Sequence, residues 1–152
     1  MKKMRNYADA IQKDVAIDEV ISLAQQQQTL NASKNEFASL NKLYPYLKQQ
    51  KKAVSYGFYL SGKLLASCVF FFSHYRAYYV LAGNHPEGRK ISASTLLIDA
   101  FIKDYAGQNL LLDFEGSDVP GIAFFFRNFG STNEKYTSIK YNRLPWLISW
   151  VK

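Results

Sequence analysis

Residues 110–117 read Leu-Leu-Leu-Asp-Phe-Glu-Gly-Ser, and residues 121–130 read Gly-Ile-Ala-Phe-Phe-Phe-Arg-Asn-Phe-Gly. The first stretch is an apolar run that ends in two carboxylates and a Gly-Ser turn, which is typical of a buried strand at its C-terminal end. The second stretch predicts an aromatic helix that closes on glycine. Because α/β folds usually bind ligands at the carboxyl ends of strands, the sequence predicts a functional site beside residues 113–115.

The segment before this strand predicts an antiparallel meander. It has three β-rich runs joined by the turn pairs Ser61-Gly62 and Ser73-His74, over residues 54–60, 63–72 and 76–81. A loop over 83–90 and a helix over 92–105 are expected to follow. Because this helix is a crossover connection, the strand over 109–114 should lie parallel to the last strand of the meander.

The two ends of the chain predict further elements. Residues 1–50 are expected to be helical, with an apolar face of Ile17, Val20, Ile21 and Ala24. The capping box at 33–36 starts a second helix, which Pro45 should bend or restart. A helix over 119–129 and a last strand over 135–141 are expected to complete the pattern.

Composition favours one globular domain over residues 1–152, with 48% apolar and 16% aromatic residues. The formal charge of +7 is spread along the chain. It indicates either a generally solvated basic surface or attraction of a phosphate-bearing ligand or an anionic surface. Specific nucleic-acid stacking is not expected, because no basic stripe accompanies the tyrosines.

The chain has one cysteine, Cys68, and two histidines, His74 and His85. These can build neither a disulfide nor a plausible zinc site, so no metal is expected and a cytoplasmic, reducing location is predicted. Cys68 is interpreted as a core thiol. The longest uncharged apolar stretch, residues 64–75, is too short for a membrane span.

The sequence resembles the second half of the GNAT acyltransferase fold over about residues 53–145. The resemblance rests on the strand at 110–115, the Gly-Ile-Ala…Phe-Arg-Asn-Phe-Gly helix at 121–130 and the trailing Asn-Arg-Leu-Pro at 142–145. Within that superfamily the chain is most similar to the second unit of Fem-type transferases and their bacterial relatives. The resemblance implies an α+β, GNAT-like fold with a mixed, mostly antiparallel sheet and helices on both faces, although no counterpart of the usual first strand is visible.

The resemblance implies that the turn before the helix at 92–105 binds the acyl donor. In GNAT enzymes this turn reads Arg/Gln-x-x-Gly-x-Gly/Ala and cradles the pyrophosphate of acyl-CoA, and the matching positions here are Arg89, Ser92 and Ser94. Lys90 and Ala93 belong to the same turn. The glycines of the motif are absent. The alternative interpretation is an N-capped helix with a solvated Arg-Lys pair.

The aromatic helix departs from the family at one position and matches it at another. Many GNAT acetyltransferases carry a tyrosine near its middle that protonates the CoA thiolate, and Phe126 stands there. Arg127 falls where Fem-type proteins carry a lysine near the tRNA terminus, which suits phosphate. Alternatively, the phenylalanines line the core or a groove, and Arg127 is a surface cation.

Asp113 and Glu115 are the candidate general bases. Strand alternation would place both carboxylates on one face, where their proximity can raise one pKa; Glu115, nearer the loop, is preferred. Equally, either carboxylate could cap the next helix or pair with Arg76, Arg127 or Arg143.

Together these features predict an N-acyltransferase that moves an acyl group from acetyl-CoA, or a related activated donor, to the primary amine of a small molecule or peptide. The alternative is a catalytically silent GNAT-like module that binds a partner protein, a twin domain or an aminoacyl-tRNA end. The apolar tail at 144–151 predicts packing on the sheet, or an interface that forms a homodimer or joins a second GNAT-like unit.

Overall fold

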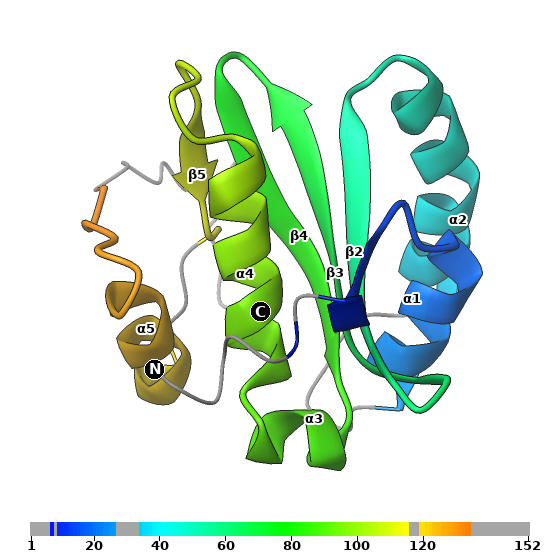
Figure 1. Cartoon of the computed structure of the whole chain (residues 1–152). Coiled ribbons are helices and arrows are strands. Elements are labelled where there is room, and N and C mark those ends of the chain that lie inside the picture. The colour runs from blue at the N-terminus through cyan, green and yellow to red at the C-terminus, as the bar shows by residue number, and fades with distance from the viewer. Residues whose placement is uncertain (1–6, 8, 27–33, 116–118, 135–152) are drawn as a thin grey trace, which may run out of the picture. The chain divides into compact units, whose positions relative to one another are not determined.

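The computed structural model describes residues 7, 9–26, 34–115 and 119–134. The chain divides into two compact units, Met1–Glu115 and Gly116–Lys152. The first unit holds a five-stranded sheet in the order β1-β2-β3-β4-β5 (Figure 1). Its strands are β1 (Ile11–Lys13), β2 (Ala53–Leu60), β3 (Lys63–Ser73), β4 (Arg76–Asn84) and β5 (Leu111–Asp113). Its helices are α1 (Ile17–Gln25), α2 (Lys34–Gln49), α3 (Pro86–Lys90) and α4 (Ala93–Asp104), and the second unit contributes α5 (Pro120–Arg127).

The sheet topology confirms the predicted meander and crossover. Strands β1 to β4 pair antiparallel with their neighbours, whereas β5 pairs parallel with β4 after the α4 connection. The prediction of a loop over 83–90 was wrong, because β4 continues to Asn84 and the short helix α3 follows. A first strand also exists: β1 pairs with β2 through Ile11 and Phe58. Three residues are too few for a visible alternation, so β1 could not be predicted from the sequence.

Helices cover both faces of the sheet, as expected. On one face α4 packs over β2 and β3, where the buried residues include Tyr56, Phe70, Leu97 and Phe101. Helices α1 and α2 cover the opposite face around Val20, Ile21, Tyr44 and Val69. Figure 1 shows α4 in front of β4, and α1 and α2 to the other side of the sheet.

Two individual expectations for the core can be compared with the structure. Cys68 is 1% exposed in the core, which confirms its interpretation as a core thiol, and burial raises the pKa of that thiol. Pro45 does not restart a helix, because α2 runs through it. Its neighbour Tyr44 anchors this part of α2 to the sheet by donating a hydrogen bond of 2.9 Å to Ser55 Oγ.

Several expectations concern residues outside those described. They include Ser33 of the capping box, the strand over 135–141, the Asn-Arg-Leu-Pro segment with Arg143, and the apolar tail. In the part of the chain that the structure describes, no helix combines the length and apolar character needed to cross a membrane.

Candidate active site

The two parallel strands of the sheet separate after a short ladder. Residues Arg76 to Tyr78 of β4 pair with Leu111 to Asp113 of β5, and the described residues contain no further pair between these strands. Strand β4 nevertheless continues to Asn84. Among the described residues, no strand pairs with β4 on this side from Val80 to Asn84, so the backbone N–H and C=O groups there can bind an extended ligand, as strands do in β-augmentation.

A β-bulge lies on β4 just beyond this point of separation. Phe70 pairs with Tyr79 and Val69 with Leu81, so Val80 is an extra residue that no β3 residue opposes. The Val80 side chain is 38% exposed in a strand whose neighbours on both sides are more buried. Bulges re-aim backbone groups and recur beside active sites. Sequence reasoning missed this feature, because an apolar residue inside a β-rich run carries no sign of a register shift.

The predicted carboxylates lie at the end of β5 and just after it, but strand alternation does not place them on one face. Strand β5 ends at Asp113, and Glu115 adopts a left-handed backbone with φ of 62°, so alternation does not extend to it. Asp113 Oδ2 accepts a hydrogen bond of 3.1 Å from Arg76, and its Oδ1 accepts one of 2.9 Å from the Glu115 backbone N–H. Strand alternation therefore does not place the two carboxylates on one face, and Asp113 pairs with Arg76, which confirms one of the alternatives stated above. The side chain of Glu115 is exposed.

Five of the six residues predicted to bind the donor lie at the junction of α3 and α4, and the sixth, Arg127, belongs to the second unit. Ser92 joins the two helices in a left-handed conformation with φ of 57°, and Ala93 begins α4. The first glycine of the family motif would stand at Ser92, so the serine keeps the unusual backbone that glycine adopts freely. Arg89 and Lys90, at the end of α3, are exposed, and no described carboxylate forms a salt bridge with either.

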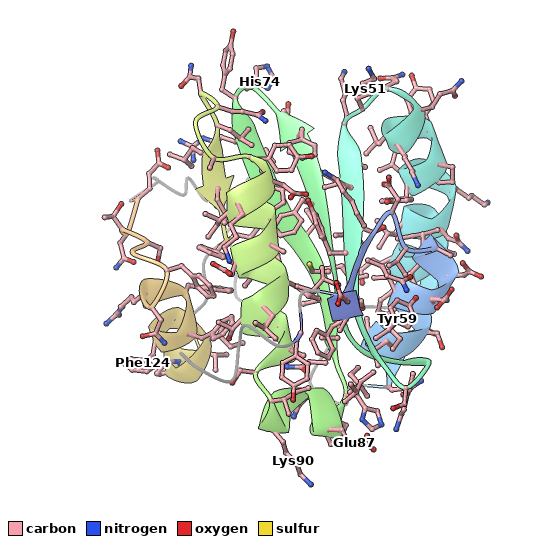
Figure 2. All side chains as sticks on the ribbon, viewed as in Figure 1. Lys51, Tyr59, His74, Glu87, Lys90 and Phe124 are labelled. Carbon is pink, nitrogen blue, oxygen red and sulfur yellow. The ribbon has the colours of Figure 1, made fainter. Side chains whose placement is uncertain are left out.

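The start of α4 can bind an anion. The backbone N–H groups of Thr95 and Leu96 donate to the Ser92 carbonyl oxygen, whereas no described acceptor pairs with those of Ala93 and Ser94. Ala93 is buried and Ser94 is partly exposed, so Ser94 is the one of these two that a ligand can reach directly. Free N–H groups and the positive end of the helix dipole favour a negative ligand at such a terminus. Figure 2 shows Lys90 and Glu87 at one end of the sheet, and His74 and Lys51 at the other.

The second unit carries the aromatic helix. Phe126 is its buried residue, and Arg127 lies in the last turn of α5 with an exposed side chain. The ring of Phe125 lies 5.8 Å from that of Phe126 and 5.4 Å from that of Phe129. Phe125, Phe126 and Phe129 thus pack on one another, in keeping with the packing alternative stated above, whereas Phe124 is 65% exposed and does not follow it.

A polar groove of about 470 Å³ lies beside α1 and reaches the start of α3. Its lining residues are Asp18, Glu19, Ser22, Leu23, Gln26, Lys63, Leu64 and His85. Tyr59 donates a hydrogen bond of 2.8 Å to Glu19, and partial burial together with this bond raises the pKa of Tyr59 to about 12. Lys63 is held by Glu87 at 3.0 Å, so the carboxylates of α1 dominate the charge of the groove.

No metal centre is built by the described residues, among which no three His, Cys, Asp or Glu side chains come together.

Comparison with known proteins agrees with this architecture. A family model described as an acetyltransferase (GNAT) domain matches residues 3–121. No curated protein matches the chain by sequence.

Solved structures share the fold at low sequence identity. A predicted acetyltransferase from Clostridium acetobutylicum, crystallised with acetyl-CoA, superposes with a TM-score of 0.68 at 11% identity, covering 87% of this chain and 94% of that one. A ribosomal-protein-alanine N-acetyltransferase from Brucella melitensis biovar Abortus 2308 gives 0.59 at 14% identity, covering 88% and 99%. An aminoglycoside acetyltransferase from an uncultured soil metagenomic sample, in complex with sisomicin, gives 0.57 at 14% identity, covering 90% and 98%.

Proposed function

Because the chain belongs to the acetyltransferase (GNAT) domain family, we propose that it moves an acetyl group from acetyl-CoA to a primary amine. The observation that carries this proposal is the turn at the start of α4, where the N–H of the partly exposed Ser94 has no acceptor among the described residues and the exposed cations Arg89 and Lys90 precede it in the same turn. That arrangement fits the pyrophosphate of CoA, since helix N-termini and guanidinium groups both favour phosphate oxygens.

The donor would extend from this turn along the edge of β4, from Asn84 to Val80, that no described strand pairs with. Asn84 precedes the turn by a few residues, and the β4 edge runs back from there to the bulge at Val80. A pantetheine arm carries amide groups that can hydrogen-bond to such an edge. The thioester would then lie near Val80, whose re-aimed backbone can stabilise the oxyanion of the tetrahedral intermediate.

The chemistry needs an unprotonated amine. The amine nitrogen attacks the thioester carbonyl, the C–N bond forms, the C–S bond breaks, and the CoA thiolate leaves and takes up a proton. We assign Glu115 the role of base that removes a proton from the amine. Asp113 is less suited, because Arg76 and the Glu115 N–H already bind its carboxylate. Phe126 cannot protonate the thiolate, so that proton would come from solvent or from another group.

A cationic acceptor is supported by the groove beside α1. Asp18 and Glu19 line it, and a carboxylate wall favours an ammonium group over a neutral or anionic molecule. Aminoglycosides, which carry several amines, are bound by a structural neighbour, although the shared fold at that identity does not transfer its acceptor to this chain.

Calorimetric titration with acetyl-CoA tests the proposal. The wild-type protein should bind with micromolar affinity, and Arg89→Ala should weaken binding about tenfold, or about 1.4 kcal/mol, through loss of a charge-assisted contact. Lys51→Ala is the matched control, because it removes a surface cation at the other end of the sheet (Figure 2). Absence of binding at millimolar acetyl-CoA would sink the acyl-CoA proposal.

A tRNA-linked donor is the second candidate. It is supported by the sequence resemblance to Fem-type transferases and by the replacement of both motif glycines with Ser92 and Ser94. In that case the protein should bind an aminoacyl-tRNA end and not acetyl-CoA. Arg127→Ala should weaken the binding of the aminoacyl-tRNA end. If neither donor binds, the chain acts as a silent GNAT-like module that holds a partner or a twin domain.

A further inference from the structure

Helix α3 lies between β4 and the proposed phosphate turn, and it contacts β3 unusually closely. A Cβ atom added to Gly88 would lie 2.3 Å from the Leu65 carbonyl oxygen and 2.9 Å from Asn84 Oδ1. Real Cβ contacts are not this short, and the first obstacle is backbone, which cannot rotate away. Only glycine lets α3 rest on this strand.

The contact is built by a local feature of β3. Phe58 of β2 pairs with Ala66 and Tyr59 with Leu64, so Leu65 is the extra residue of a β-bulge. The Leu65 carbonyl oxygen accepts a hydrogen bond of 2.8 Å from the His85 backbone N–H. It therefore holds the end of β4 while Gly88 packs against it.

Two side-chain contacts hold the same helix. His85 caps α3, because its Nδ1 accepts a hydrogen bond of 3.2 Å from the Glu87 N–H. Glu87 in turn pairs with Lys63 of β3 at 3.0 Å, across exposed side chains. The cap and the Gly88 contact together fix α3 relative to β3, whereas the exposed ion pair contributes little.

The position of α3 is passed on to the start of α4 through backbone bonds. The N–H of Ile91 donates to the Gly88 carbonyl oxygen at 3.3 Å, and that of Ser92 donates to Arg89 at 3.1 Å. Ser92 then accepts from Thr95 and Leu96 of α4. A shift of α3 away from β3 therefore moves the left-handed Ser92 and the N–H groups of Ala93 and Ser94 at the start of α4.

We propose that Gly88 is a positioning residue for donor binding: its close contact with the Leu65 bulge sets the geometry of the phosphate turn. This inference rests on the proposed function, because it assigns the turn to acetyl-CoA. A turn without the two motif glycines has less freedom to adjust to a phosphate. The backbone of the turn must therefore already have the right geometry before the phosphate binds, and the contact of Gly88 with β3 holds it in that geometry.

The test compares Gly88→Ala with Gly57→Ala. A Cβ at Gly57 would lie 2.7 Å from Val15 Cγ2, so both substitutions crowd the fold, but Gly57 is in the middle of β2. Acetyl-CoA affinity, measured by calorimetry, should fall at least tenfold in Gly88→Ala and stay within twofold of wild type in Gly57→Ala. Once an acceptor is known, KM for acetyl-CoA should rise with kcat changing less than threefold.

A ligand-free readout separates this inference from the proposed function. In ¹⁵N-labelled protein without ligand, the amide resonances of Ser92, Ala93 and Ser94 should shift in Gly88→Ala and not in Gly57→Ala. Unshifted amides, or unchanged affinity in Gly88→Ala, would overturn the inference. Failure of the wild type to bind acetyl-CoA would overturn the proposed function, while the amide shifts would still decide whether Gly88 positions the turn.

A second pair of variants serves if Gly88→Ala does not fold. His85→Ala changes a partly exposed side chain and removes the cap of α3. Because the cap helps to fix α3, its loss should weaken acetyl-CoA binding about threefold. His85→Asn restores a side-chain acceptor, so it should recover most of the affinity. Equal affinity of all three proteins would contradict the coupling between α3 and the turn.

Discussion

At the scale of single residues, burial and hydrogen bonding distinguish carboxylates with a structural role from the proposed catalytic base. Asp113 is half-buried and bound by Arg76 and a backbone N–H, which suits a structural anchor at the end of β5. Glu115 is exposed, two residues further on. Asp104, at the end of α4, accepts hydrogen bonds from the buried Tyr56 at 2.7 Å and from Lys13 at 3.0 Å.

Glu115→Gln should separate the proposed base from a structural carboxylate. The amide keeps the size of the side chain and cannot take a proton, so kcat at neutral pH should fall about 100-fold with little change in thermal stability. The rate should recover as pH rises and more of the amine is already unprotonated. Asp113→Asn is the control, and should lower stability by about 1 kcal/mol through the weakened Arg76 contact. Unchanged kcat in Glu115→Gln would remove Glu115 from the mechanism.

Asp104 should make stability depend on pH. Although burial opposes it, the hydrogen bonds from Tyr56 and Lys13 lower the pKa of Asp104 below its ordinary value of 3.8. A carboxyl with a lowered folded-state pKa stabilises the fold above that ordinary value, and this contribution is lost as pH falls through the folded pKa. The melting temperatures of wild type and Asp104→Asn, measured from pH 7 to pH 2, should therefore differ at neutral pH and converge in acid. A constant difference across that range would contradict the assignment.

At the scale of secondary-structure elements, turns and bulges decide what the sheet presents. The β3–β4 turn uses His74 and Tyr75, both with positive φ, at 49° and 61°. Two-residue hairpin turns of this kind favour Asn-Gly, because β-branched or bulky residues are strained there. The Val80 bulge interrupts the β3–β4 ladder beside the proposed donor path, and the Leu65 bulge interrupts the β2–β3 ladder where α3 packs on β3.

Replacing the turn by His74→Asn and Tyr75→Gly should stabilise the protein. Relief of left-handed strain at two positions is expected to add about 1–2 kcal/mol to the free energy of unfolding, measured by denaturant titration. The turn lies at the end of the sheet opposite Lys90 (Figure 2), so acetyl-CoA affinity should not change. A loss of affinity would show that this hairpin belongs to the binding site.

At the scale of the whole molecule, charge bears on ligand attraction. The chain has 19 Lys and Arg against 12 Asp and Glu, and no described segment gathers the excess into a stripe. A net charge of +7 raises the local concentration of an anionic donor without specifying where it binds. A cytoplasmic location stays a prediction from the single cysteine.

Salt should therefore weaken donor binding. Raising ionic strength from about 0.01 M to 0.1 M shortens the Debye length from about 30 Å to 10 Å, so acetyl-CoA affinity should fall severalfold. Pantetheine, which has no phosphate, is the control and should bind with no salt dependence. An acetyl-CoA affinity that does not change with salt would contradict a binding mode based on phosphate contacts.

Local patterns in the sequence were sufficient for most of the fold. The meander, the crossover helix and the parallel strand were predicted from residue periodicity, because β-rich runs, two-residue turns and an apolar helical face are local signals. The candidate phosphate turn was also predicted, since its residues are contiguous and the resemblance aligned them. Strand β1 and helix α3 were missed because each is too short to show a period.

Only the tertiary structure decided how the candidate site is arranged. The bulges at Leu65 and Val80 depend on the register between strands, and register arises from pairing partners distant in sequence. The pairing of Asp113 with Arg76 depends on the crossover that brings β5 against β4. Gly88 carries no local sign of its role, because the constraint comes from a carbonyl 23 residues earlier, on another strand. Periodicity predicts which face of a helix or strand a residue lies on. The contacts of that residue depend on residues distant in sequence, which only the tertiary structure brings next to it.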